Sequence, residues 1–281
     1  MKKFVCQCAL MGELYVMDLA LWLIFFSTVT MTSSEDSVEA YLNRCLDGVN
    51  HKTKPGPESN LFGQCNQYKE LSCCTEETTR GLHQSHSWLN FNWHHCDTQL
   101  SKACTAFLNH DLCFYECSPN VAPWLVPHNI SIRNERYKGI PLCESECNAW
   151  WDACRYDLTC KDNWALGWDW SAGVNVCPAG TTCRTFEDVF GSAANMCHQI
   201  WAGAFNVTAD NEQCMVFYFS DTNPNREVAR YYAERMLKES SIATNSAVEL
   251  SSSIFIFLFS LIVYILHHYH LCYHVVSRTE L

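Results

Sequence analysis

The chain has 281 residues, a formal net charge of −11 at pH 7 and 19 cysteines. The acidic balance argues against a nucleic-acid partner, because proteins that bind nucleic acids carry basic patches. Sixteen of the cysteines lie between Cys45 and Cys214, which allows at most eight disulfides there. Such a framework persists only in an oxidising compartment. The sequence therefore predicts a secreted-type ectodomain and excludes a cytosolic enzyme.

The first segment, residues 1–34, has the order of a secretory signal peptide. Two lysines precede an apolar core from Leu19 to Phe26, and small and polar residues follow. This order matches the basic flank, short apolar segment and cleavage region of a signal. The leader is longer than usual, which makes Met17 a second candidate start. A membrane-spanning helix is the alternative, which the short apolar core disfavours.

Residues 35–238 are predicted to form one domain, since about 200 residues can bury a core. Cys143, Cys147 and Cys154 share one face of a helix of 3.6 residues per turn. Cys113 and Cys117 repeat the i, i+4 spacing, and Cys104 falls on the opposite side of the same helix. A helix bridged on two faces is a buried helix.

A further helix is predicted at 226–237, after the turn residues 223–225. Few segments alternate cleanly between apolar and polar residues. The predicted fold class is therefore α+β: a small, mostly helical and loop-rich domain, stapled by disulfides, with short strands. The sequons at Asn129 and Asn206 would carry glycans on surface loops.

All of the ten tryptophans except Trp22 lie in this domain, with clusters at 150–151 and 164–170. A small core needs fewer rings than these, so the excess predicts a cleft lined by aromatic side chains. Such a cleft suits a planar heteroaromatic ligand, on which flat rings can stack.

The C-terminal region has the order of a lipid-anchor signal. A small and polar segment, residues 239–253, contains Asn245 as one possible attachment site, and residues 254–281 begin with an uncharged apolar run. A transmembrane helix is the alternative, but the run of 13 residues from Ile254 falls short of the ~20 that a bilayer requires. Either arrangement places the domain on the extracellular face of the plasma membrane.

Several long motifs resemble the folate receptor family, which includes folate receptors, riboflavin-binding proteins and the egg-surface receptor Juno. They are NWHHC, DLCFYECSPNVAPW, RNERYKGIPLCESECNAWWDAC, TCKDNWALGWDWSAGVNVC and CHQIW. The resemblance covers residues 45–236 and implies the family's fold. It also implies a disulfide connectivity that spacing alone leaves open. The implied pairs are Cys45–Cys73, Cys65–Cys113, Cys74–Cys117, Cys96–Cys183, Cys104–Cys154, Cys143–Cys214, Cys147–Cys197 and Cys160–Cys177.

The resemblance further implies a pterin-binding set. Asp111 occupies the position of the carboxylate that grips the pterin, whose ring N–H and amine it can accept in two parallel bonds. Arg133 and Arg136 match the paired arginines that bond the carbonyl edge, and Trp201 matches the stacking tryptophan. Positions along the groove to its mouth are matched by Trp164, Gly167 and Trp168.

The chain also departs from the folate-binding pattern. A second stacking tyrosine is replaced by Leu89, with Trp88 adjacent, and a tryptophan before the arginine pair is replaced by Ile132. Polar groups that hold the ligand's glutamate tail are replaced by Ala165, Leu166, Ala204 and Phe205. The pterin end is thus partly kept, while the tail end has lost polar groups.

Two functions follow from the resemblance. The first is a receptor that binds folate or a reduced folate and internalises it by endocytosis, with acid release through Asp111 or through His94, His95 or His110. The alternative is a Juno-like adhesion receptor that binds a sperm surface protein and not folate, which the apolar substitutions favour. Riboflavin is a further possible ligand.

An enzyme is not predicted, because the chain lacks a nucleophile elbow, a glycine-rich phosphate loop and an HExxH motif. No cofactor and no metal site are expected. His83 and His86, and the histidines near the C-terminus, have metal-like spacing, but the framework cysteines would be oxidised.

Overall fold

The computed structural model describes residues 38–85 and 88–279, so the expected signal peptide lies outside the described residues. Its helices are α2 (Val38–Leu42), α3 (Glu76–Gln84), α4 (Lys102–Cys117), α5 (Glu144–Cys154), α6 (Phe186–Phe190), α7 (Ala193–Gln199) and α8 (Asn225–Thr279). Short 3-10 turns are η1 (Gly63–Tyr68), η2 (Trp88–Asn90) and η3 (Ala122–Trp124). The strands are β1 (Leu125–Ile130), β2 (Arg133–Tyr137), β3 (Ile140–Cys143), β4 (Leu158–Thr159), β5 (Arg184–Thr185) and β6 (Phe205–Thr208). The predicted fold class is confirmed.

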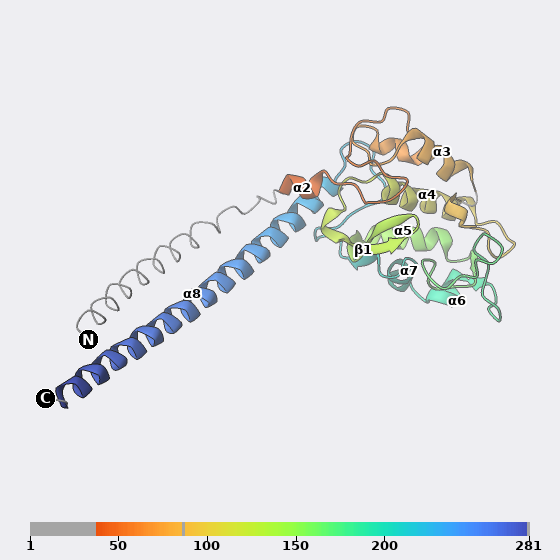
Figure 1. Cartoon of the computed structure of the whole chain (residues 1–281). Coiled ribbons are helices and arrows are strands. Elements are labelled where there is room, and N and C mark those ends of the chain that lie inside the picture. The colour runs from red at the N-terminus through yellow and green to blue at the C-terminus, as the bar shows by residue number, and fades with distance from the viewer. Residues whose placement is uncertain (1–37, 86–87, 280–281) are drawn as a thin grey trace. The chain divides into compact units, whose positions relative to one another are not determined.

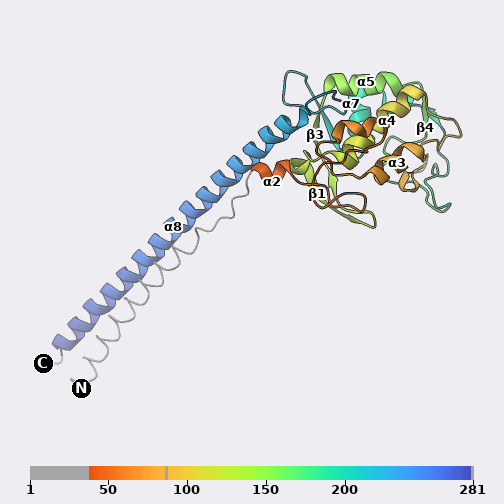
Figure 2. The same cartoon turned by 90° about the horizontal axis from the view of Figure 1, so that it is seen from above.

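Helix α4 occupies the centre of the fold, between α3 and α5 in both views (Figure 1, Figure 2). It begins where the Ser101 hydroxyl accepts a hydrogen bond from the backbone N–H of Cys104 at 3.2 Å, which satisfies one of the free N–H groups of the first turn. Three disulfides then hold the helix: Cys104 to α5, Cys113 to η1, and Cys117 to the segment before α3. The predicted buried helix bridged on two faces is present.

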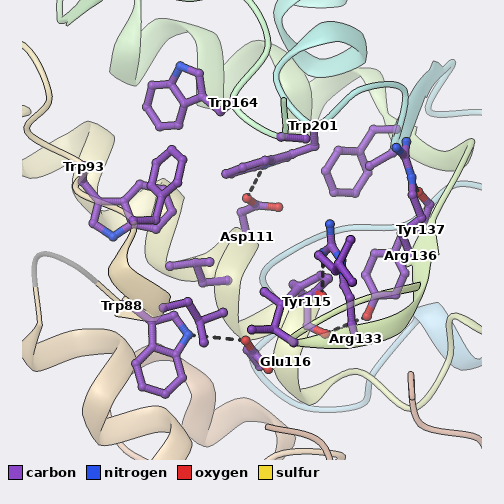
Figure 3. A pocket seen from close by; sticks show the side chains of 18 of the residues that line it. Trp88, Trp93, Asp111, Tyr115, Glu116, Arg133, Arg136, Tyr137, Trp164 and Trp201 are labelled. Atoms are coloured by element: carbon purple, nitrogen blue, oxygen red, sulfur yellow. Dashed lines mark hydrogen bonds between the residues drawn. The ribbon is translucent and has the colours of Figure 1, made fainter. Parts of the chain in front are cut away.

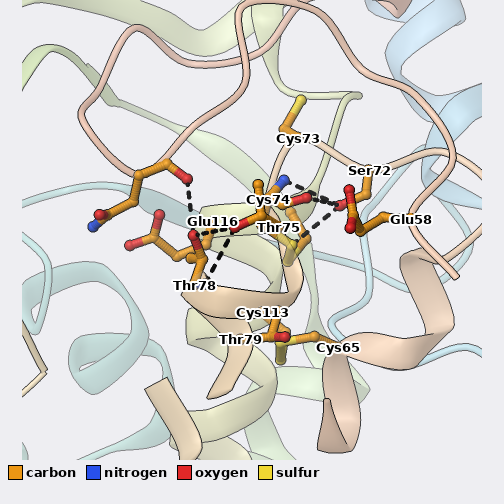
Figure 4. The surroundings of a disulfide bond; sticks show 12 residues. Glu58, Cys65, Ser72, Cys73, Cys74, Thr75, Thr78, Thr79, Cys113 and Glu116 are labelled. Atoms are coloured by element: carbon orange, nitrogen blue, oxygen red, sulfur yellow. Dashed lines mark hydrogen bonds between the residues drawn. A yellow bond between two sulfur atoms is a disulfide. The ribbon is translucent and has the colours of Figure 1, made fainter. Parts of the chain in front are cut away.

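Eight disulfides join the sixteen cysteines of the 45–214 region, in the pairs that the family resemblance implies. The adjacent Cys73 and Cys74 lead to different partners, Cys45 and Cys117. The intervening backbone is fixed locally, because the Cys74 N–H donates to the Ser72 hydroxyl at 3.0 Å (Figure 4). Thr75 then caps α3 by accepting from the Thr78 N–H, so the disulfide and the helix start lie next to each other.

Among the described residues the strands pair only in twos: β1 with β2, β3 with β6, and β4 with β5. The β1–β2 hairpin is antiparallel and contains one extra residue on β1, between Pro127 and Ile130. Asn129 on β1 and Asn206 on β6 are exposed. The prediction that these sequons lie in loops is wrong in detail, because every strand of a two-stranded sheet is an edge and can expose side chains without loop structure.

The main hydrophobic core lies on the α5 side of α4. It includes Phe114, Trp150 and Phe217, which are fully buried, and their rings meet edge to face. Burial of one such ring stabilises the fold by roughly 1.5–3 kcal/mol. A smaller core lies on the η1 side and contains Tyr68 and Leu82. Helix α4 contributes residues to both cores, so its position is fixed from two sides.

Helix α8 includes the predicted helix at 226–237 and continues to Thr279. The continuation has a simple cause, since residues 226–279 contain neither proline nor glycine. The segment expected as a polar linker, 239–253, is therefore helical. Within residues 38–85 and 88–279, no helix combines the length and apolar character that crossing a membrane requires.

A candidate ligand-binding cavity

A cavity of about 230 Å³ opens beside α4 (Figure 3). Its walls come from η2, α4, the β1–β2 hairpin, the loop after β4 and the segment between α7 and β6. The lining residues are Trp88, Leu89, Phe91, Trp93, Asp111, Leu112, Tyr115, Glu116, Ile130, Ile132, Arg133, Arg136, Tyr137, Trp164, Ala165, Trp170, Trp201, Ala204 and Phe205. Most of this surface is aromatic or aliphatic, with few charged groups, which is the composition of a small-molecule site.

Asp111 is the buried acid of the cavity, with 3% of its surface exposed. Its Oδ2 accepts a hydrogen bond from Trp201 Nε1 at 2.7 Å, which fixes both the carboxyl and the indole (Figure 3). Burial raises the pKa of Asp111 to about 7, and the bond from Trp201 opposes this shift only in part. Near neutral pH the carboxyl therefore exists in both protonation states, and a ligand that donates hydrogen bonds would favour the ionised one.

Two arginines from β2, Arg133 and Arg136, also line the cavity. Arg133 donates from Nη1 to the Tyr115 hydroxyl at 2.7 Å, and its guanidinium carbon lies 5.5 Å from the centroid of that ring. Arg136 donates to the carbonyl oxygens of Ala202 and Tyr137. Among the described residues neither arginine forms an ion pair with a carboxylate, so each keeps donors for a ligand.

Arg133 and Arg136 lie on β2, on either side of the point opposite the bulge in β1. Residues three apart on a flat strand face opposite sides of the sheet. Arg133 pairs with Ile130 beyond the extra residue, and Arg136 pairs with Val126 before it. A bulge increases the local twist of a hairpin, and both arginines line one cavity.

Trp88 is held in place by close packing against Gly81 and by a hydrogen bond to Glu116. A Cβ at Gly81 of α3 would lie 2.2 Å from Trp88 Cζ3, so only glycine allows the ring to pack this close. Trp88 Nε1 donates to Glu116 Oε1 at 3.4 Å, and Leu89 and Asn90 both have positive φ. A leucine at φ 54° is uncommon, so the turn is strained where it forms the cavity wall.

Of the eight positions predicted to bind a ligand, the structure brings six into the cavity wall: Trp88, Asp111, Arg133, Arg136, Trp164 and Trp201. Gly167 and Trp168 are not among the lining residues. The Trp168 ring is buried instead, and its Nε1 donates to the carbonyl oxygen of Trp164 at 2.8 Å. Its polar group is thus used within the fold, and it supports the wall from behind.

Five of the six departures from the folate-binding pattern line the cavity: Leu89, Ile132, Ala165, Ala204 and Phe205. Leu166, the sixth, is outside the lining and 52% exposed. Sequence reasoning missed Tyr115, which follows Asp111 at i+4. Glu116 likewise follows Leu112 at i+4. Residues four apart lie on the same face of a helix, so a helical wheel centred on Asp111 would have identified Tyr115.

Glu116 is fully buried, and burial raises its pKa. Its second oxygen, Oε2, lies 3.5 Å from His51 Nε2 and accepts no hydrogen bond among the described residues. The histidines predicted as acid sensors do not line the cavity. Burial lowers the pKa of His95 to about 4, so this ring stays neutral where Asp111 titrates, and burial also lowers the pKa of His110.

His83 has a role within the fold. Its Nδ1 bonds the Thr79 carbonyl at 2.8 Å, and its Nε2 accepts from the Gln64 N–H at 3.2 Å. Both ring nitrogens are therefore engaged by the protein. His86, the other half of the proposed pair, lies outside the described residues.

Comparison with known proteins supports the same interpretation of the fold. The folate receptor family model matches residues 44–216. Folate receptor gamma of Homo sapiens is 43% identical over 201 residues, which covers 69% of this chain and 82% of the relative. Folate receptor alpha of Homo sapiens is 39% identical, with 69% and 78% covered. Riboflavin-binding protein of Dromaius novaehollandiae is 36% identical over 176 residues, with 61% and 70% covered.

Fold and cavity together define a disulfide-stapled binding protein with a preformed site for a small aromatic molecule. The chain belongs to the folate receptor family. By their names these relatives are receptors and binding proteins, and none of the three names describes an enzyme.

Proposed function

We propose that this chain is a cell-surface receptor that binds folate or a reduced folate in the cavity and carries it inward by endocytosis. The observation that supports this most is Asp111, a buried carboxyl fixed by Trp201 at the base of an aromatic cavity. A pterin presents a ring N–H and an amine to such a carboxylate, and hydrogen bonds to a charged group contribute about 1.5–3 kcal/mol each.

The remaining walls suit the rest of the pterin. Arg133 and Arg136 offer donors to its carbonyl edge, and the Trp201 ring offers a stacking face, for about 0.5–1.5 kcal/mol beyond area burial. No cofactor is part of this proposal, since the folate is the cargo. A lipid anchor at Asn245 and glycans at Asn129 and Asn206 complete the proposed extracellular form; all three side chains are exposed.

The direct test is saturation binding of radiolabelled folate to cells that express the full chain, compared with the Asp111→Asn variant. High-affinity binding that the variant lacks is the expected result. Release of the receptor by a phospholipase specific for inositol-lipid anchors tests the anchor separately.

The alternative function, an adhesion receptor that binds a sperm surface protein, is favoured if folate does not bind. The cavity would then no longer bind folate, and the substitutions at Leu89, Ile132 and Ala165 would account for that loss. In that outcome, the protein on the cell surface should still contain its eight disulfides, which mass spectrometry of unreduced peptides would establish.

A further inference from the structure

A second cavity, of about 330 Å³, lies against another face of α4. Its lining residues are Ala103, Ala106, Phe107 and His110 of α4, Glu146 of α5, and Tyr218 in the segment before α8. None of them lines the cavity that contains Asp111. The four residues of α4 follow the spacing i, i+3, i+4 and i+7, which places them on one face of the helix. Helix α4 therefore turns different faces to the two cavities.

The walls of this second cavity are joined covalently. The disulfide Cys104–Cys154 connects α4 to α5. The disulfide Cys143–Cys214 connects the residue before α5 to the segment that leads to Tyr218. The Glu146 carboxyl is fixed further by a hydrogen bond from the backbone of Phe217. A cavity with walls fixed in this way loses little conformational freedom when a ligand binds.

Glu146 is a carboxylate that lacks a cation. Its side chain is half-buried, and among the described residues it enters no ion pair. Burial raises its pKa, because the charged form loses part of its hydration. His110 does not compensate, since burial lowers the pKa of its ring below the ordinary value of 6.5 and the ring is mostly neutral at pH 7.4. A cation that entered the cavity would offset the cost of this buried charge.

The other lining groups also suit a cation on a hydrocarbon stem. The rings of Phe107 and Tyr218 line the cavity, and aromatic faces attract ammonium groups. The His110 ring meets Tyr218 edge to face at 5.3 Å, and its Nδ1 is buried without a hydrogen bond among the described residues. That nitrogen can accept a hydrogen bond when the ring is neutral. Ala103 and Ala106 add small apolar surface, along which methylene groups can lie.

From this composition we infer that the second cavity binds an alkylammonium group, with Glu146 as its counter-ion and the Tyr218 ring as a cation–π contact. An ammonium has three N–H donors, of which Glu146 and His110 can accept two and water the third. A free amine and a lysine side chain of a partner protein share this chemistry. The inference is independent of the proposed function, because the two cavities have no lining residue in common.

The test titrates the full chain, purified without reductant from a secretory cell line, with n-butylammonium and with 1-butanol. The two probes have the same length, and only the first is charged. Broadening of the probe's proton NMR signals measures binding. We expect a dissociation constant in the millimolar range for n-butylammonium and binding at least ~5-fold weaker for 1-butanol. Equal binding of the two probes would overturn the inference, because an apolar surface alone would then explain it.

Three variants locate the site. Glu146→Gln should weaken n-butylammonium binding by about 10-fold, since it removes the counter-ion. Tyr218→Leu should weaken it by about 2- to 5-fold, since it removes the aromatic face and keeps an apolar side chain. Glu144→Gln is the matched control: Glu144 lies two residues before Glu146 on α5, is exposed and does not line the cavity, so binding should change by less than about twofold.

Equal effects of Glu146→Gln and Glu144→Gln would overturn the inference, because net charge and not this site would then attract the probe. Mass spectrometry of the unreduced variants verifies that the eight disulfides have formed. The comparison of n-butylammonium with 1-butanol uses the unaltered chain, so it decides the question even where a variant is not secreted.

A third probe distinguishes the two sources of the ammonium group. Nα-acetyl-lysine N-methylamide carries the same four-carbon ammonium together with the backbone of a lysine residue. Binding of this probe at least ~3-fold tighter than that of n-butylammonium supports a lysine of a partner protein, and equal binding supports a free amine. Loss of binding through the added backbone, with n-butylammonium still bound, would exclude the protein source and leave the ammonium site in place.

Discussion

Asp111 combines two demands that oppose each other. The side chain must be ionised for both oxygens to accept hydrogen bonds from a donor ligand, yet its burial favours the protonated form and raises its pKa to about 7. The empty site is therefore costly at neutral pH, and a ligand that supplies donors relieves that cost. His95 shows the other outcome of burial, because its pKa falls to about 4 and it remains uncharged throughout.

The first prediction concerns stability without ligand. Between pH 4 and pH 7 the folded chain holds a proton on Asp111 that the unfolded chain has released, so stability falls as pH rises through this window. Asp111→Asn keeps an acceptor for Trp201 and removes the ionisation. We expect the variant to be more stable than the original chain at pH 7.4, by on the order of a few kcal/mol, and equal to it below pH 4.

Denaturant unfolding at several pH values, with disulfides intact, measures this difference. An identical pH slope in both proteins would show that Asp111 is not the group responsible.

The second prediction concerns ligand release. Affinity for folate should fall between pH 7.4 and pH 5 by up to ~100-fold, because protonated Asp111 has lost its charge and part of its acceptor capacity. Equilibrium binding across this range gives the profile. His110→Gln is the matched control and should leave the profile unchanged, since His110 does not line the cavity and burial lowers its pKa. A flat profile in the original chain would rule out Asp111 as the acid sensor.

At the scale of elements, α4 and the turn at η2 build the cavity in different ways. Helix α4 is regular and tethered by three disulfides, so Asp111 and Tyr115 follow from helical spacing. The η2 turn is irregular, with two positive φ values, and it keeps Trp88 in place through Gly81 behind it and Glu116 beside it.

The third prediction follows from that contact. Gly81→Ala would ordinarily stabilise a helix by up to about 1 kcal/mol. Here the added methyl meets Trp88, and overpacking costs about 1–3 kcal/mol, so we expect net destabilisation and a weakened Trp88–Glu116 bond. Chemical denaturation and ligand affinity report the two effects. Gly56→Ala is the control, because the nearest atom to its Cβ is the end of the Lys52 side chain at 4.0 Å. If the Gly81→Ala protein were as stable as the original, the η2 turn would have moved to accommodate the added methyl group at no cost in stability.

This element also shows what the sequence could and could not predict. Cysteine spacing predicts the helices at 104–117 and 143–154, and the family motifs place Asp111 and Trp201 correctly in the cavity wall. The wall formed by Trp88 depends on Gly81, which is seven residues away in another element, and local patterns do not report such a contact. Trp168 was predicted to lie along the groove but is buried, and its Nε1 donates to the Trp164 carbonyl oxygen. Residue spacing does not show which way such a side chain turns.

On the scale of the whole molecule, covalent connections determine which parts move together. Cys104–Cys154 closes a separation of 50 residues and joins α4 to α5, whereas Cys160–Cys177 closes only 17. In the chain-entropy model these bonds contribute about 4 and about 3 kcal/mol. The longer bond also lies on the helix that carries Asp111.

The fourth prediction compares the two bonds. Replacing Cys104 and Cys154 together by alanine should lower the free energy of unfolding by about 1 kcal/mol more than replacing Cys160 and Cys177, and should weaken folate binding more. Secreted yield, denaturant midpoints and binding titrations provide the comparison. Equal losses in both double variants would mean that loop length does not govern the contribution of these bonds.

Helix α8 bears on how the receptor would respond to mechanical load. Its contacts with the domain include a few buried residues, among them Val228, Ala229 and Ala233, the Tyr232 ring against Trp124, and ion pairs from Arg226 and Arg230 to Glu39 on α2. Every residue that lines the cavity precedes Cys214, the last cysteine of the disulfide network. A pull on the C-terminal end, as a tether under shear would exert, would peel the first turns of α8 from the domain before it strained a covalent bond. The cavity would keep its shape and its bound ligand while α8 separated from the domain.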